Sequence, residues 1–153
     1  MAMSTSSRTK SASSTTDTVV IALGSNLGDR AWHLRRAIRE LSRLVRIVRV
    51  SSMHETEPVD TPRGSPDFLN MVLVARTSLP PHTLLREMLA IETRLGRRRS
   101  IRNAPRVIDL DLIFYGARHI RTPDLIVPHP RWMERDFVIA PLREVMRLSS
   151  SRA

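Results

Sequence analysis

The sequence predicts a single α+β domain in which two helices pack on one face of a four-stranded antiparallel sheet, followed by a short C-terminal extension. Strand-like segments and segments with helical apolar spacing follow one another in the order β-α-β-β-α-β. The length of 153 residues and the hydrophobic content of 41% fit one such domain. This element order is typical of the ferredoxin-like arrangement.

The first half of the chain holds two predicted strands and one helix. The β-branched, apolar run Thr18–Leu23 indicates a buried strand that ends at the turn-forming segment Gly24–Asp29. The alternation of basic and β-branched residues in Ile47–Ser52 predicts a second strand. The segment His54–Asp67, rich in proline, is expected to be a long loop without secondary structure. Between the two strands, the apolar face of a helix is formed by Leu34, Ile38, Leu41 and Val45.

The second half supplies the remaining elements. Alternation in Phe68–Thr77 predicts a strand with Leu69, Met71 and Leu73 on one face and Asn70, Val72 and Val74 on the other. Proline is tolerated in the first turn of a helix, so Pro80-Pro81 is expected to open one that stops at Gly96. Its apolar stripe is Leu84, Met88, Ile91 and Leu95. A last strand is predicted at Val107–Tyr115 and a short final helix at Phe137–Met146.

Both ends of the chain are expected to lie outside this domain. Residues 1–17 are rich in Ser and Thr and nearly free of apolar side chains, which predicts a disordered tail. A transit peptide is disfavoured because the tail carries only Arg8 and Lys10. The folded domain is predicted over residues 18–148, with a disordered end at 149–153.

Composition excludes several classes of protein. The longest apolar run, Val19–Leu23, is far shorter than the ~20 residues of a membrane-spanning helix. The chain has no cysteine, so it has no disulfide scaffold and no cysteine nucleophile, and its five histidines form no metal-binding pair. The formal net charge is +10, and Lys10 is the only lysine. We therefore expect a cytoplasmic domain with an anionic partner: nucleic acid, an acidic membrane surface or a phosphorylated small molecule.

The positive charge is concentrated in two segments. Seven arginines lie between Arg30 and Arg49 against a single acid, Glu40, and we interpret them as a solvated helix face. Five more lie between Arg97 and Arg106, in a turn-prone segment where functional groups tend to be placed. The second segment is therefore the candidate anion-binding region.

The segment Ile108–Phe114 carries two aspartates at alternate positions. In a strand, Asp109 and Asp111 share one face, where two carboxylates repel unless a cation lies between them. Such oxygen ligands suit Mg²⁺, which takes one or two carboxylates together with substrate phosphates. A solvated strand face is the alternative, and the pair by itself does not decide between them. The arginines of 97–106 favour phosphoryl or pyrophosphoryl transfer, without a P-loop.

Phe68 and Asn70 share a face of their predicted strand. An aromatic ring beside a carboxamide can stack on a flat heterocycle and hydrogen-bond its edge. Without further context, a core residue beside an edge residue is the commoner interpretation of such a pair.

Seven short motifs, spread from about Val19 to Val145, together resemble one enzyme family. In chain order they are Gly24-Ser-Asn-Leu-Gly-Asp29, Glu55-Thr-Glu-Pro-Val59, Pro66-Asp-Phe-Leu-Asn70, the arginine segment Gly96–Arg106, Ile108-Asp-Leu-Asp-Leu112, Val127-Pro-His-Pro130 and Arg135-Asp-Phe-Val-Ile-Ala-Pro-Leu142. The set resembles the 6-hydroxymethyl-7,8-dihydropterin pyrophosphokinases of folate biosynthesis. The resemblance implies a ferredoxin-like monomer that transfers pyrophosphate from MgATP to the pterin's hydroxymethyl group and releases AMP, without nucleic acid or membrane partners.

The resemblance also implies roles for individual residues. It makes Arg97, Arg106, Asp109 and Asp111 catalytic, with the two aspartates binding two Mg²⁺ ions that arrive with ATP. The pterin contacts are Glu57, Pro58, Val59, Phe68, Asn70 and Phe137. The nucleotide contacts are Glu92, Arg99, Leu112, His129 and Arg135.

Two other interpretations remain open at this stage. A nucleic-acid-binding module on the same scaffold would account for the charge, but the chain lacks the aromatic strand motif of such modules and carries only six aromatic residues. A catalytically inactive relative is suggested by Asn103 and Ala104, where the family commonly has Trp-Gly. Pterin-dependent release of AMP separates the pyrophosphokinase from both.

Overall fold

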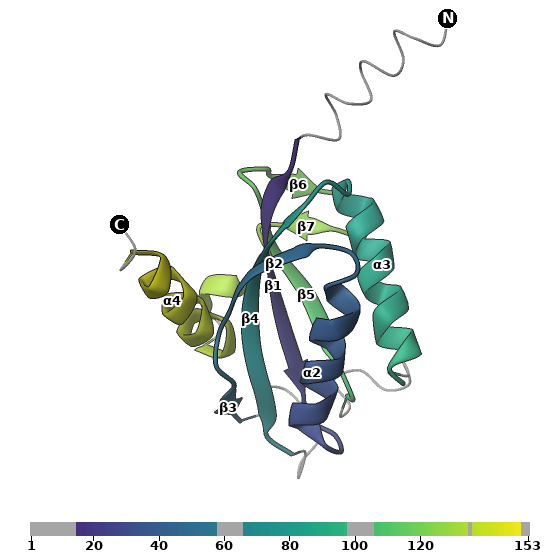
Figure 1. Cartoon of the computed structure of the whole chain (residues 1–153), viewed down its shortest axis with the longest axis vertical. Coiled ribbons are helices and arrows are strands. Elements are labelled where there is room, and N and C mark those ends of the chain that lie inside the picture. Colours follow the sequence, from purple (N-terminus) through teal and green to yellow (C-terminus); the bar gives the residue numbers. More distant parts are fainter. Residues whose placement is uncertain (1–14, 58–65, 98–105, 135, 151–153) are drawn as a thin grey trace, which may run out of the picture.

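The computed structural model describes residues 15–57, 66–97, 106–134 and 136–150, the last range with side chains only at 138–146. Its five main strands form one sheet, and a two-stranded hairpin lies beside it (Figure 1). The elements in chain order are β1 (Asp17–Ser25), α2 (Arg30–Leu41), β2 (Arg46–Val50), β3 (His54–Thr56), β4 (Phe68–Thr77), α3 (Pro81–Arg94), β5 (Asp109–Tyr115), β6 (Ile120–Arg121), β7 (Ile126–Val127), the 3₁₀ turn η1 (Trp132–Glu134) and α4 (Asp136–Ser150).

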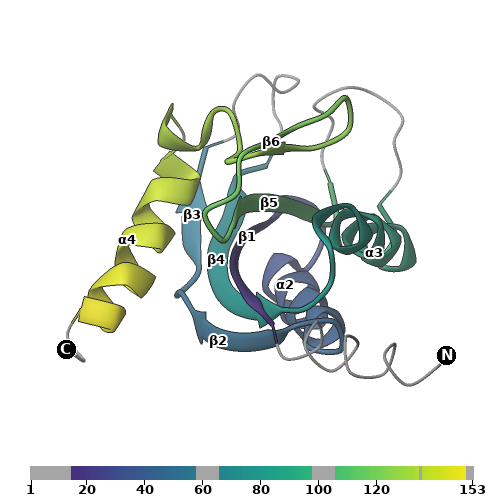
Figure 2. The same ribbon diagram turned by 90° about the horizontal axis from the view of Figure 1, so that it is seen from above.

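The sheet confirms the predicted ferredoxin-like topology. Its strands run in the order β2-β4-β1-β5, and each neighbouring pair is antiparallel. Helices α2 and α3 cover one face, and α4 lies across the other, as the view from above shows (Figure 2). The C-terminal extension therefore forms a third layer over the sheet.

The helix boundaries follow from their capping residues. Helix α2 starts after Asp29, whose side chain accepts a hydrogen bond from a backbone N–H of the first turn. It ends at Leu41, so Val45, predicted on its apolar stripe, is instead buried in the turn before β2. Helix α3 begins with Pro80-Pro81 as predicted, and the chain leaves it through Gly96 at a φ of +105°, which favours glycine.

Alternation along the strands separates two hydrophobic layers. On the side of α2 and α3, the core includes Ile21, Leu23, Met71, Leu73, Leu84 and Leu112. On the side of α4, a smaller core includes Val20, Ala22, Val72, Val74, Val138 and Leu142. The predicted division of residues in β4 between the two faces is confirmed. Among the described residues, no helix is long and apolar enough to cross a membrane.

Three segments differ from the sequence-based expectation. The loop expected over His54–Asp67 contains strand β3, which pairs with the start of β4. Helix α4 is longer than the predicted Phe137–Met146 and continues to Ser150, two residues past the predicted end of the domain. At the other end β1 already begins at Asp17. Residues 1–14 and 151–153 lie outside the described residues, so the disorder of these termini stays a prediction.

Helix α4 is tied to the β2–β3 connection by the carboxylate of Glu144. Its Oε2 accepts a hydrogen bond from the backbone N–H of Ser52 (2.8 Å), and its Oε1 accepts one from the Ser52 hydroxyl (2.7 Å). The His54 Nε2 lies 3.0 Å from the same Oε1. These hydrogen bonds from Ser52 and His54 lower the pKa of Glu144 below its usual value. The ionised carboxylate therefore holds the third layer against the sheet.

Replacement of Glu144 by glutamine is expected to destabilise the fold by about 1–2 kcal/mol at neutral pH, because the acceptor loses its charge. A carboxyl group whose pKa is lowered on folding stabilises the protein above its unfolded-state pKa, and this stabilisation is lost as the pH falls through the folded-state pKa. Urea unfolding of the wild type and Glu144→Gln from pH 7 to pH 3 should give free energies that converge in acid. A difference that persists unchanged at low pH would contradict this account.

Candidate active site

Three central strands bring their functional residues together at one end of the sheet. Gly24, near the end of β1, pairs with Asn70 of β4 on one side and with Asp109 of β5 on the other. Ala22 pairs in the same way with Asp111. The register therefore places Asn70, Asp109 and Asp111 on the same face of the sheet, the one that α4 partly covers. The predicted common face of the two aspartates is confirmed.

Gly24 forms the floor between these groups. A Cβ atom added at Gly24 would lie 2.9 Å from the Asn70 Oδ1 and 3.4 Å from the Phe68 Cδ1. The carboxamide and the ring thus lie directly over the glycine backbone, and a side chain there would displace them. The Asn70 Nδ2 donates a hydrogen bond to the Thr56 Oγ1 (2.6 Å), which fixes the orientation of the amide. Phe68 is half-buried, so part of its ring faces outward.

A compact ionic cluster lies on the opposite side of Gly24. The Asp109 carboxylate binds two guanidinium groups, with Oδ1 at 2.8 Å from the Arg97 Nη1 and Oδ2 at 3.0 Å from the Arg106 Nη1. Arg97 Nη1 also contacts the Glu92 Oε2 at 2.7 Å. The three side chains of the Arg97–Asp109–Arg106 bridge are between 15% and 24% exposed, so solvent and ligands can still reach them. Arg97 and Arg106 flank residues 98–105, which lie outside the described residues, and both bind the first aspartate.

Glu92 lies beneath this cluster and is only 3% exposed. Its Oε2 accepts the backbone N–H of Leu110 (2.7 Å), so the carboxylate joins α3 to the outer edge of β5. Burial raises the pKa of Glu92, while the Leu110 N–H and the Arg97 charge act in the opposite direction. Glu92 therefore holds the Arg97 side chain and the β5 backbone in position. The resemblance did not indicate these two contacts.

Two polar side chains that the sequence analysis did not single out shape the surrounding loops. The buried Asn26 accepts the backbone N–H of Arg106 through Oδ1 (2.7 Å) and donates to the backbone carbonyl of Pro66 through Nδ2 (3.3 Å). It lies within the glycine-flanked motif after β1, which was the only sequence signal for it. Asn26 thereby connects the ends of two loops that meet at the site.

Arg30 is the second of these side chains. Its Nη1 contacts the Glu55 Oε2 and the backbone carbonyl of Asp67, both at 2.9 Å. It therefore holds the two ends of the segment between β3 and β4, which contains three of the six predicted pterin contacts, Glu57, Pro58 and Val59. The interpretation of Arg30 as part of a solvated helix face was wrong, whereas Arg35, Arg36 and Arg39 are exposed as predicted.

The other predicted residues lie in different parts of the structure. Leu112 is buried in the core, and its side chain points away from the aspartates. The backbone N–H of His129 donates to the Ile113 carbonyl (2.9 Å), which holds the loop after β7 against β5. Glu57 is exposed at the end of a described range. Pro58, Val59, Arg99, Arg135 and the side chain of Phe137 lie outside the described residues.

No group of three or more histidine, aspartate or glutamate side chains gathers as a metal site within the described ranges. Asp109 and Asp111 are instead a pair on one face of β5. A pair suits a hydrated cation that also binds substrate phosphates.

Comparison with known proteins decides the family. The profile of the 7,8-dihydro-6-hydroxymethylpterin-pyrophosphokinase family matches residues 20–147. The chain belongs to this pyrophosphokinase family. The match begins within β1, spans β2 to β7 and covers most of α4, so it includes every described residue of the site.

Relatives in the pyrophosphokinase family match most of this chain. The 2-amino-4-hydroxy-6-hydroxymethyldihydropteridine pyrophosphokinase of Bacillus subtilis is 47% identical over 127 residues, which are 82% of this chain and 75% of that protein. The mitochondrial folate synthesis bifunctional protein of Arabidopsis thaliana is 43% identical over 144 residues, 94% of this chain and 26% of that one. The chain thus spans about a quarter of the length of that bifunctional relative.

A solved structure shares the fold of this pyrophosphokinase-family chain. The wild-type HPPK-DHPS of Plasmodium falciparum, crystallised with pteroate, superposes with a TM-score of 0.66 at 15% identity. The alignment covers 85% of this chain and 39% of the Plasmodium chain. At this identity the likeness supports the sheet order and the placement of the helices.

Substitutions of Glu92 are expected to separate two of its effects on stability. One is the hydrogen bond that it accepts from the Leu110 N–H, and the other is the effect of its raised pKa. Glu92→Ala leaves the Leu110 N–H buried without an acceptor and should cost about 1–3 kcal/mol more stability than Glu92→Gln, which retains an acceptor. Because the pKa of Glu92 is raised on folding, its contribution is complete below the unfolded-state pKa and is lost as the pH rises through the folded-state pKa. Denaturant unfolding between pH 4 and pH 8 should therefore favour the wild type over Glu92→Gln increasingly towards acid. The opposite slope would show that the buried charge itself stabilises the fold.

Proposed function

We propose that this protein transfers pyrophosphate from MgATP to the hydroxymethyl oxygen of 6-hydroxymethyl-7,8-dihydropterin and releases AMP. The observation that carries the proposal is the convergence at Gly24. A carboxamide and an aromatic ring lie on one side of this glycine, and an arginine-bound aspartate lies on the other. This arrangement offers a place for a flat heterocycle beside a place for phosphates.

The pterin is proposed to bind on the side of Phe68 and Asn70. The half-exposed ring of Phe68 can stack on one face of the heterocycle, and Phe137 at the start of α4 is the proposed second ring. The Asn70 amide donates to Thr56 through its nitrogen, which leaves its oxygen directed over Gly24 as an acceptor for a ring N–H. Burial of Asn70 at 4% exposure keeps this acceptor in a fixed position.

The triphosphate is proposed to bind on the side of Arg97 and Arg106. Both guanidinium groups are anchored to Asp109, and phosphate oxygens are anionic partners that suit their fork of N–H donors. The N–H of Leu110 points to the outer edge of β5, so the backbone of Leu112, two residues further along the strand, faces the same edge. This edge is the proposed position of the nucleotide base, with Glu92, Arg99, His129 and Arg135 nearby on the nucleotide side.

Asp109 and Asp111 fit a site for the two Mg²⁺ ions that accompany ATP. They lie on one face of β5, they are half-buried, and two arginines bind the first of them. When bound, Mg²⁺ neutralises charge on the transferring phosphates. We propose that the arginines exchange Asp109 for phosphate oxygens when ATP binds, which frees the carboxylate for the metal.

The residues of the site act mainly by positioning the two substrates relative to each other. The pterin ring held at Phe68 and Asn70 directs its hydroxymethyl oxygen across Gly24 towards the phosphates at Arg97 and Arg106. The oxygen attacks the β-phosphorus, the bond to the α-phosphate oxygen breaks, and AMP leaves with the electron pair of that bond. The arginines stabilise the negative charge that develops on the phosphate oxygens. Asp109 is the proposed acceptor of the hydroxyl proton.

Replacement of Asp111 by asparagine is expected to lower pterin-dependent AMP release by about 100-fold or more, because the metal site loses one of two carboxylates. The substitution conserves side-chain shape and leaves the described Arg97–Asp109–Arg106 bridge in place. Asp124→Asn, an exposed acid-to-amide change in the β6–β7 hairpin, is the matched control and should retain activity. Full activity of Asp111→Asn would refute the metal assignment. Absence of AMP release from the wild type, with steeply salt-dependent RNA binding, would refute the proposed function.

The pterin side is tested by Gly24→Ala. Its backbone has an ordinary strand φ, so the added methyl group strains no backbone dihedral, and any fall in the unfolding temperature should reflect only the movement of Asn70 and Phe68. The Cβ would instead displace the Asn70 amide and the Phe68 ring. We expect the KM for the pterin to rise about tenfold, which corresponds to roughly 1.4 kcal/mol, and the KM for ATP to change much less. Equal changes in both constants would contradict the placement of the pterin over Gly24.

A further inference from the structure

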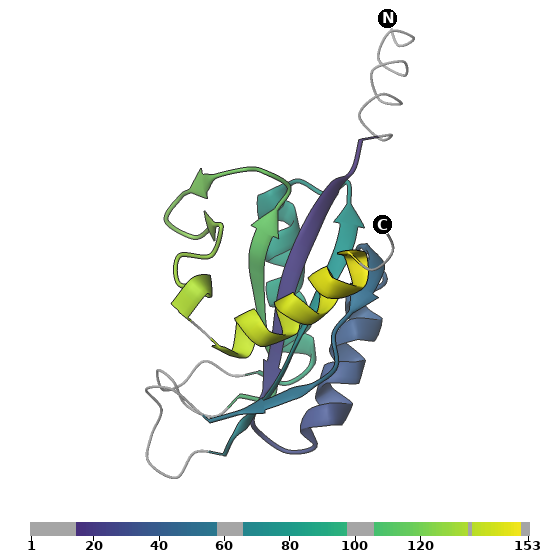
Figure 3. The ribbon, with the colours of Figure 1, turned by 90° about the vertical axis from the view of Figure 1, so that its left-hand side faces the viewer.

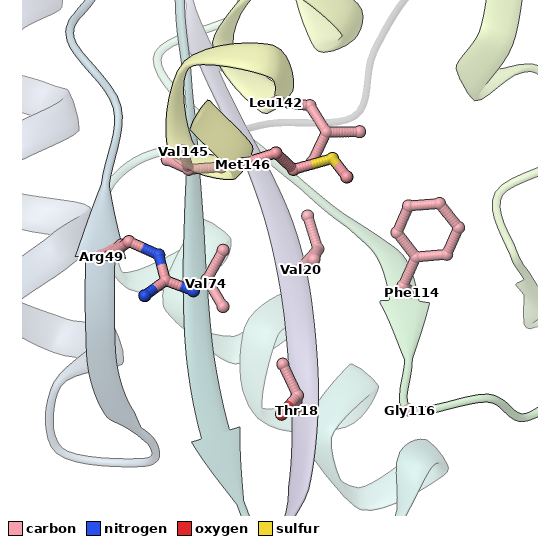
Figure 4. A pocket seen from close by; sticks show the side chains of 9 residues that line it. All are labelled: Thr18, Val20, Arg49, Val74, Phe114, Gly116, Leu142, Val145 and Met146. Atoms are coloured by element: carbon pink, nitrogen blue, oxygen red, sulfur yellow. The ribbon is translucent and has the colours of Figure 1, made fainter. Parts of the chain in front are cut away.

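A second pocket lies on the α4 face of the sheet, away from the site at Gly24. Its volume is about 490 Å³, and strands β1, β2, β4 and β5 form its floor while α4 forms its wall (Figure 4). Most of the lining is apolar and includes Val20, Val74, Phe114, Leu142 and Val145. The view onto the α4 face of the sheet shows α4 crossing the strands obliquely (Figure 3).

The pocket and the candidate active site use different parts of the same strands. Val20 precedes Gly24 on β1 by four residues, which is roughly 13 Å along a strand. On β5, Phe114 lies three residues beyond Asp111, towards the other end of the sheet. None of the lining residues is among those assigned to the pterin, the nucleotide or the metal.

Among the described residues that line the pocket, Arg49 is the only charged one. Its register opposite Val74 of β4 puts it on the α4 face, and its guanidinium extends from β2 towards Val74 (Figure 4). The Arg49 Nε is buried and has no hydrogen-bond partner among the described residues. Buried donors are almost always satisfied, so this one lacks an acceptor that a ligand can provide. Arg46 on the same strand is exposed, as are most of the other arginines in the first basic segment.

We propose that this pocket binds a small organic monocarboxylate with an apolar body. The carboxylate would accept hydrogen bonds from the Arg49 Nε and a neighbouring guanidinium nitrogen, which is the bidentate geometry that arginine favours. The apolar body would lie against Val20, Val74 and Phe114 and extend along α4. One cation matches one negative charge, whereas a polyanion such as a nucleotide would leave charges against the apolar wall. The volume lies in the range of small-molecule sites.

The proposal is tested with octanoate, titrated by calorimetry into the 153-residue chain below the concentration at which octanoate forms micelles. Octanamide has the same shape without the charge and is the matched ligand. We expect saturable binding of one octanoate per chain and at least tenfold weaker binding of octanamide. Amide binding as tight as that of the acid, or the absence of saturable octanoate binding, overturns the proposal.

Variants and chemical shifts locate the site. Arg49→Gln should weaken octanoate binding at least tenfold, while Arg46→Gln, an exposed change on the same strand, should leave it unchanged. In the wild type, octanoate should shift the methyl resonances of Val20, Val74 and Val145, a measurement that does not depend on a variant that folds. Equal affinity of the two arginine variants, or shifts confined to residues around Gly24, overturns the proposal. Because the pterin and ATP occupy the other site, saturating amounts of both should leave octanoate affinity unchanged.

Discussion

The two ion pairs of Asp109 organise the charged half of the candidate active site. Arg97 lies three residues after the end of α3, Arg106 lies in the segment before β5, and Asp109 is the first residue of β5. One carboxylate therefore connects a helix, a strand and both described ends of the arginine segment. Without it, two guanidinium groups would face each other at the edge of the sheet without a shared counter-charge. Phosphate oxygens can replace the Asp109 carboxylate as this counter-charge. The ion pairs of Asp109 therefore stabilise the fold and also hold two arginines where an anion can bind.

The uncharged half depends on a steric constraint at Gly24. Its missing side chain lets the Asn70 amide and the Phe68 ring lie over the sheet, next to the ion pairs rather than above a layer of side chains. The antiparallel register sets the spacing between the halves, because Gly24 pairs with Asn70 and with Asp109 at once. Contacts around the site hold the neighbouring loops and helix α4 in position. Asn26 and Arg30 hold the ends of the neighbouring loops, and Glu144 holds α4 against the β2–β3 connection.

Local pattern was sufficient to predict most of the fold. Alternation located the strands and assigned the faces of β4 and β5, since these properties depend on neighbours two residues apart. Contacts between distant segments could not be predicted in this way. Strand β3 forms inside a proline-rich segment because β4 offers it a partner. Arg49 was interpreted as part of a solvated face, but the register with β4 and the later helix α4 place its Nε in a pocket.

The same distinction between local patterns and contacts of distant segments applies to the candidate site. The paired aspartates and their arginine neighbours were visible as spacing and charge, but which arginines bind Asp109 depends on the path of the chain between α3 and β5. The buried position of Glu92 likewise depends on the packing of α3 against the edge of β5. Asn26 and Glu144 contact residues 80 and 92 positions away, and no local pattern marks such contacts.

The exchange of partners at Asp109 is tested most directly by a crystal structure with Mg²⁺ and an ATP analogue that cannot be cleaved between its α- and β-phosphates. Our account expects the guanidinium groups of Arg97 and Arg106 on phosphate oxygens, with Asp109 and Asp111 on the metal. A structure in which both arginines still bind Asp109 while the phosphates lie elsewhere would contradict it.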